Sequence, residues 1–176
     1  MTTTGTIVPQ NFKTMKSTTT VSIETFKSLM QAHWTEQEQS NVLFAIDLMH
    51  NTMNERKFDY ILSKYKDLSY TQYNRSIPNG ISGLMSYVKE LSKSYPDYTY
   101  TPKQIMADRN KVIFHAHVTL NSKDLGDENK GFIVMDIWEI KGQTIKHWDA
   151  LQPLNFSMRF GSLFLGGKIR NENGTF

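Results

Sequence analysis

Three ionisable side chains between residues 136 and 149 have the types and spacing that proton-transfer chemistry needs. Asp136 lies five residues before Lys141-Gly142, and His147 lies five residues after that pair. A two-residue hairpin turn at Lys141-Gly142 would set Asp136 directly opposite His147, with Asp149 on the same face. A carboxyl group among apolar neighbours has a raised pKa, and an adjacent histidine is held in one tautomer. Spacing alone favours an ordinary cross-strand pair, on a face that meets solvent or a second subunit.

Two further histidines, His115 and His117, alternate along a predicted strand and point the same way. With His147 and Asp149 they could form a metal site, because imidazole and carboxylate groups bind iron, zinc or manganese. A metal site of the cupin type needs an acidic ligand soon after the two histidines, and residues 118–122 contain none. Histidines that form hydrogen bonds in a polar cavity or at a subunit contact explain the pattern equally well. We therefore expect no metal site.

The elements that would position these side chains begin with helices. Apolar residues recur at helical spacing in four segments, and Thr35 with Glu38 has the spacing of a capping box at the start of the second. Pro96 ends the fourth helix, because proline lacks the N–H group that a further turn requires. The expected helices are Phe26–His33, Thr35–Met53 with a break around residues 51–54, Phe58–Tyr65 and Ile81–Tyr95, and a short extended stretch covers Leu68–Asn74.

After Pro96 the hydrophobic pattern changes from helical to alternating, which indicates a sheet. The connections are short, so consecutive strands are antiparallel neighbours. The expected strands are Tyr98–Met106, Val112–Leu120, Gly131–Ile140 and Thr144–Gln152. Helices on one face of such a sheet make an α+β domain.

Composition limits the possible functions of this 176-residue chain. A net charge of only +3, spread along the sequence, provides no basic patch for nucleic acid. Cysteine is absent, which excludes disulfides and thiolate sites. No apolar run reaches the length of a membrane span, and the Thr-rich start lacks a signal-peptide core, so we expect a cytoplasmic protein. Residues 1–20 are expected to be a mobile tail, 21–154 a single domain and 155–176 a C-terminal extension.

Two segments carry a resemblance to a known family. The run Tyr70-Thr-Gln-Tyr-Asn74 before a Pro-Asn-Gly turn, and above all residues 136–152 (DIWEIKGQTIKHWDALQ), are similar to SnoaL-like proteins of the nuclear transport factor 2-like superfamily. The resemblance covers about Gln37 to Pro153 and is closest to the aldol-condensation and polyketide-cyclase type. It implies a cone in which N-terminal helices pack on a curved antiparallel sheet and cover a conical pocket. That superfamily places several unrelated reactions on one fold.

The resemblance also implies roles for individual residues. Asp149 would be a general base, Asp136 a second candidate for it, and His147 or His117 would orient the base or protonate the oxyanion. Tyr73 would donate to a carbonyl oxygen. The other expected substrate-binding residues are Tyr70, Asn74, His115, Phe132 and Trp138. SnoaL-like cyclases remove a proton next to a carbonyl group without a cofactor, and we expect none here.

The leading functional hypothesis is a cofactor-independent lyase or isomerase that performs enolisation, cyclisation or aldol-type chemistry on a small hydrophobic carbonyl compound. The alternative is a non-catalytic small-molecule-binding or dimerisation module of the same fold. A third hypothesis is an epoxide hydrolase-like or metal-dependent enzyme, although His117 stands where the hydrolases need a carboxylate. We also expect a homodimer through the outer sheet face, whose apolar residues are Ile133, Met135, Ile137, Trp148 and Ala150.

Overall fold

The computed structural model describes residues 21–74 and 76–155. The expected N-terminal tail and residues 156–176 of the expected C-terminal extension lie outside the described residues. The helical elements are α1 (Ile23–Lys27), α2 (Glu36–Met49), the π-helical turn η1 (His50–Asn54), α3 (Phe58–Lys64), α4 (Gly80–Ser94) and the 3₁₀ turn η2 (Ser122–Asp124). The strands are β1 (Ser69–Gln72), β2 (Thr99–Asp108), β3 (Lys111–Thr119), β4 (Phe132–Lys141) and β5 (Thr144–Pro153). No helix in these described ranges is long and apolar enough to cross a bilayer.

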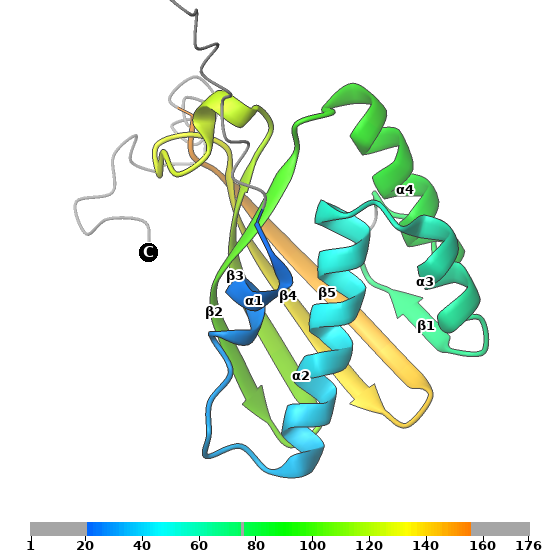
Figure 1. Cartoon of the computed structure of the whole chain (residues 1–176). Helices are drawn as coiled ribbons and strands as arrows, with labels where there is room; N and C mark the ends of the chain where they lie inside the picture. Colours follow the sequence, from blue (N-terminus) through cyan, green and yellow to red (C-terminus); the bar gives the residue numbers. More distant parts are fainter. Residues whose placement is uncertain (1–20, 75, 156–176) are drawn as a thin grey trace, which may run out of the picture.

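The described strands form one sheet in the order β1-β5-β4-β3-β2, and the long helices lie along one face of it (Figure 1). Strands β2 to β5 pair as the expected antiparallel meander. The sheet is mixed and not purely antiparallel as expected, because β1 joins its edge in parallel with β5. A register shift between Pro102 and Gln104 marks an irregularity in β2, the kind of feature that bends a strand. The α+β cone expected from the sequence is confirmed.

Local sequence signals explain how α2 begins and ends. The capping box is formed: Thr35 Oγ1 accepts from the Glu38 amide, and Glu38 Oε2 accepts from the Thr35 amide. The helix then continues into η1, at the place where the sequence pattern breaks. This turn brings the Asn54 side chain against β2, where it donates to the Tyr100 carbonyl at 2.9 Å and accepts from the Tyr100 amide at 2.9 Å. The end of α2 thereby fixes the position of Tyr100.

The expected register of the β4–β5 hairpin is wrong by two residues. The turn residues are Gly142 and Gln143, so Lys141 pairs with Thr144 and Asp136 stands opposite Asp149. Gly142 has φ +58°, a backbone conformation that glycine adopts without strain and lysine does not. A shift of two residues leaves every side chain on its expected face, because the strand period is two. The inner face therefore still carries Asp136, His147 and Asp149.

The core lies between this inner sheet face and the helices. Fully buried aromatic and aliphatic side chains from both layers fill it, among them Phe26, Ile46, Leu48, Val88, Tyr100, Phe114 and Trp138. The outer face of the sheet carries the half-exposed Ile133, Met135, Ile137 and Trp148. Dimerisation through that face stays a prediction.

Candidate active site

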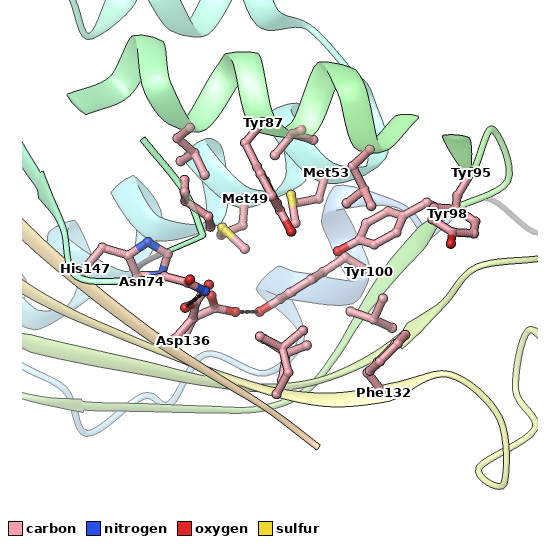
Figure 2. A pocket seen from close by; sticks show the side chains of 18 of the residues that line it. Met49, Met53, Asn74, Tyr87, Tyr95, Tyr98, Tyr100, Phe132, Asp136 and His147 are labelled. Carbon is pink, nitrogen blue, oxygen red and sulfur yellow. Dashed lines mark hydrogen bonds and ion pairs between the residues drawn. The ribbon is translucent and has the colours of Figure 1, made fainter. Parts of the chain in front are cut away.

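An apolar cavity of about 190 Å³ lies between α4, the end of α2 with η1, and the inner face of the sheet. An engineered cavity of about 150 Å³ holds a benzene molecule, so this one has room for a single ring with a substituent. Figure 2 shows side chains from the helices above and the strands below converging on it. Two carboxyl groups, Asp136 and Asp149, and the His147 imidazole are among its lining residues.

Asp136 is 2% exposed, and each of its oxygens lies within hydrogen-bond distance of a partner. The Tyr100 hydroxyl donates to Oδ2 at 2.6 Å, and His147 Nε2 lies 3.0 Å from Oδ1 (Figure 2). Because Asp136 stands opposite Asp149, His147 reaches it along the diagonal between the strands. The expected contact between Asp136 and His147 is thus present, although the two are not directly opposite. Buried carboxylates need such donors, since desolvation of an unpaired charge is costly.

His147 is 2% exposed and is held on several sides. Its Nδ1 atom lies 2.6 Å from the Tyr70 hydroxyl and 3.0 Å from Nε2 of Gln72. The Trp138 indole stacks on the imidazole with ring centroids 4.7 Å apart and an angle of 8° between the planes. These contacts hold the ring with its Nε2 atom directed at Asp136.

Asp149 is half-buried at the cavity wall and accepts a hydrogen bond from the Asn74 side chain. Burial raises the pKa of the Asp149 carboxyl, and the negative charge of Asp136 raises it further. Burial is the largest of these influences. The hydrogen bond from Asn74 lowers the pKa and is the second largest, the charge of Asp136 is a smaller raising influence, and His147 also lowers the pKa, but the net shift is upward. Asp149 is therefore a stronger base than an ordinary aspartate, and it lies where a ligand in the cavity can reach it.

Tyrosine hydroxyls supply the remaining polar groups of the cavity. The Tyr98 and Tyr87 hydroxyls point toward its middle, whereas that of Tyr100 points at Asp136 (Figure 2). Burial raises the pKa of Tyr98 and of Tyr100, and the charge of Asp136 adds to both shifts. These hydroxyls keep their protons at neutral pH and can act as hydrogen-bond donors.

The structure brings most of the predicted site residues together. Asp136, His147, Asp149, Asn74 and Phe132 line the cavity. Two other predicted ligand-binding residues lie behind it and support His147: Tyr70 through its hydroxyl and Trp138 through stacking.

Three predicted site residues lie elsewhere. His117 and His115 alternate with inward-facing Phe114, Ala116 and Val118, so both point away from the cavity, and the prediction that they share a site with Asp149 is wrong. His117 Nε2 instead lies 2.8 Å from the Lys130 carbonyl oxygen. The reason is the strand period: His115 and His117 pair with Met135 and Ile133 of the outer face.

Tyr73 is the third predicted site residue that lies outside the cavity. It is 47% exposed and stacks on Trp148 of the outer face, with ring centroids 4.5 Å apart. Its expected role as donor to a substrate carbonyl is therefore wrong.

The four residues considered as possible metal ligands lie on opposite faces of the sheet: His115 and His117 on the outer face, His147 and Asp149 on the inner face. Within the described residues no group of three or more His, Asp or Glu side chains could hold a metal ion.

Sequence reasoning names Tyr100 only as one of several aromatic residues that could line a pocket, and it does not single out Gln72. Tyr100 donates to Asp136, and Gln72 donates to His147. The only sequence signal for Gln72 is its place two residues after Tyr70, on the same face of the strand. The sequence does not predict the parallel pairing of β1 with β5, which sets Gln72 opposite His147.

Comparisons with known proteins agree with this arrangement at the level of the fold. A candidate polyketide cyclase from Bacillus cereus ATCC 10987 superposes with a TM-score of 0.55 at 16% identity, over 69% of this chain and 81% of that one. TsrD from Streptomyces laurentii gives 0.51 at 15% identity, over 66% and 92%. A SnoaL-like polyketide cyclase from Agrobacterium tumefaciens C58 gives 0.50 at 14% identity, over 69% and 97%.

The chain has the fold of these polyketide-cyclase and SnoaL-like structures. No sequence profile of a protein family matches it, and no curated protein does. At these identities the likeness establishes the fold, and a SnoaL-like fold hosts several reactions.

Proposed function

We propose that this protein is a cofactor-independent enzyme that transfers a proton on a small hydrophobic carbonyl compound, with Asp149 as the general base. The observation that supports it is a half-buried carboxyl group with a raised pKa in the wall of an apolar cavity. The names of the structural neighbours, which include polyketide cyclases, are consistent with this class of chemistry.

The proposed step begins with ionised Asp149, which removes a proton from the carbon next to the carbonyl group. The C–H electron pair forms the enolate double bond, and the negative charge moves to the carbonyl oxygen. A tyrosine hydroxyl that points into the cavity, such as that of Tyr98, donates a hydrogen bond to this oxygen. If the ketone carries a β,γ double bond, the enolate is conjugated with it, and return of the proton from Asp149 to the γ carbon gives isomerisation. If the enolate carbon instead attacks a second carbonyl carbon of the same molecule, the C=O π bond breaks, its oxygen takes up the proton from Asp149, and the product is cyclised.

The charges around the cavity narrow the class of ligand. Two carboxyl groups, and no lysine or arginine from the described parts of the chain, line it. A negatively charged ligand would be repelled by Asp136 and Asp149 in a poorly solvated space. The proposed substrate is therefore an uncharged ketone or aldehyde whose ring fits among Met49, Tyr98 and Phe132.

Exchange of carbon-bound hydrogen tests this proposal without knowledge of the natural substrate. Acetophenone would be dissolved in D₂O with the protein, its binding measured by calorimetry and the loss of its methyl proton signal followed by NMR. We expect binding and accelerated exchange with the wild type. Asp149→Asn should still bind the ketone but lose about 10²- to 10⁴-fold in exchange rate, the usual contribution of a general base.

Asp67→Asn is the matched control, because it removes the same charge from an exposed position on the surface. It should exchange at the wild-type rate. Binding without accelerated exchange would contradict the enzymatic proposal and support the binding-module alternative. Absence of binding by acetophenone would contradict the proposed ligand class.

A further inference from the structure

The hydrogen bonds behind the cavity fix the proton count of His147. Its Nδ1 atom faces the Gln72 side-chain amide at 3.0 Å. That amide has a defined orientation, because Gln72 Oε1 accepts the Asn74 backbone N–H at 3.0 Å. The NH₂ group, a donor only, must therefore be the end that faces His147. A proton on Nδ1 would place two donors against each other, so Nδ1 carries a lone pair.

The other contacts of the ring agree with this assignment. The Tyr70 hydroxyl, 2.6 Å from Nδ1, can donate to the same lone pair. Nε2 then carries the single proton and donates it to Asp136 Oδ1 at 3.0 Å. Every one of these groups is at most 9% exposed. These contacts fit an imidazole that carries one proton, on the Nε2 atom that faces Asp136.

A neutral His147 has a consequence for the charge balance of the site. A buried histidine beside a carboxylate is commonly protonated, since the opposite charge favours it. A positive charge on His147 would lower the pKa of Asp149. If the ring is neutral, no positive charge on His147 offsets the negative charge of Asp136. That negative charge then raises the pKa of Asp149, which stands opposite on the neighbouring strand.

We propose that Gln72 is a positioning residue that keeps His147 neutral, so that the charge of Asp136 strengthens Asp149 as a base. The effect on Asp149 rests on the proposed function, whereas the state of His147 does not. The titratable groups that face the imidazole are Tyr70 from β1, Asp136 from β4 and Asp149 from β5 itself. None of these is a cation that could replace the missing positive charge.

Nitrogen NMR of the imidazole tests the first part directly. At pH 7 the wild type should show an unprotonated Nδ1 and a protonated Nε2 for His147. Gln72→Glu replaces the NH₂ donor with an acceptor oxygen of the same shape, and should produce protons on both ring nitrogens. Gln104→Glu is the matched control, since it makes the same change on an exposed position of β2 and should leave His147 unaltered.

Gln72→Met provides a second route if the buried glutamate prevents folding. It removes the opposing donor without adding charge, so the Tyr70 oxygen is free to accept a proton from Nδ1. The ring should then become protonated at Nδ1, and the midpoint of the pH profile for acetophenone exchange should move to lower pH. A purely structural role for Gln72 would lower the rate at every pH and leave the midpoint in place.

Two results would overturn the proposal: a proton on Nδ1 in the wild type at pH 7, or an unprotonated Nδ1 in both Gln72 variants. Failure of the proposed function is distinguishable from this, because it would abolish exchange while the NMR spectra of His147 follow the pattern described above.

Discussion

Removal of the Tyr100 hydroxyl should destabilise the protein through Asp136 alone. The ring of Tyr100 is fully buried and stacks on Phe26 with centroids 6.1 Å apart, and phenylalanine preserves this packing. What disappears is one hydrogen bond of 2.6 Å to a carboxyl group that is 2% exposed. Hydrogen bonds to charged groups contribute about 1.5–3 kcal/mol, and the loss leaves Asp136 Oδ2 unpaired. Tyr100→Phe should therefore lower the free energy of unfolding by about 1.5–3 kcal/mol.

Urea denaturation at pH 7 measures this change, with an unaltered m-value as the sign that the folded and unfolded states stay comparable. In the Asp136→Asn background the same substitution should cost only about 0.5–1.5 kcal/mol, because the hydrogen bond then joins neutral groups. Tyr95→Phe, at a position that is 41% exposed, is the control and should change stability by less than about 0.5 kcal/mol. An equally small effect of Tyr100→Phe, or no coupling with Asp136→Asn, would refute the reasoning.

Two further predictions concern the helix over the cavity and the buried tyrosines. Gly83→Ala should destabilise the protein by about 1–3 kcal/mol in urea denaturation, because a Cβ atom on Gly83 would overlap the Pro78 carbonyl oxygen, whereas the exposed Ser86→Ala should have little effect. In an alkaline titration followed by phenolate absorbance, Tyr65, Tyr70, Tyr98 and Tyr100 should stay protonated after ordinary tyrosines have ionised, since burial raises the pKa of each. In the unfolded chain these tyrosines have a pKa near 10, so their contribution to stability is complete only below about pH 10 and the free energy of unfolding should fall as the pH rises above it. Ionisation of all tyrosines before the protein unfolds would contradict this prediction.

Local sequence patterns predict much of the fold. The capping box of Thr35 and Glu38, the apolar stripe of α4 and the alternation after Pro96 each depend on neighbours in the sequence, and each element is present. The face of the β4–β5 hairpin was predictable for the same reason. Its register was not, because Gly142 is a central residue of the turn at 141–142 and of the turn at 142–143. The turn that forms places Gly142, with φ +58°, at the first central position in place of Lys141.

The parts of the site that sequence could not supply depend on contacts between distant segments. The parallel pairing of β1 with β5 brings Tyr70 and Gln72 to His147. In the sequence, Tyr70 and Gln72 lie 77 and 75 residues before His147. The error over His117 has a different origin. The alternation that places Phe114 and Val118 in the core already assigns His115 and His117 to the outer face, so a shared site with Asp149 was incompatible with the strand period.

The central claim is that Asp149 is a strengthened base because it is half-buried opposite the charge of Asp136. Its most direct test is a carbon NMR titration of the Asp149 side-chain carboxyl in the wild type and in Asp136→Asn. The pKa of Asp149 should lie above the ordinary value of 3.8 in the wild type and fall toward it when the Asp136 charge is removed. A wild-type pKa at or below 3.8, or a raised pKa that Asp136→Asn leaves unchanged, would contradict the account.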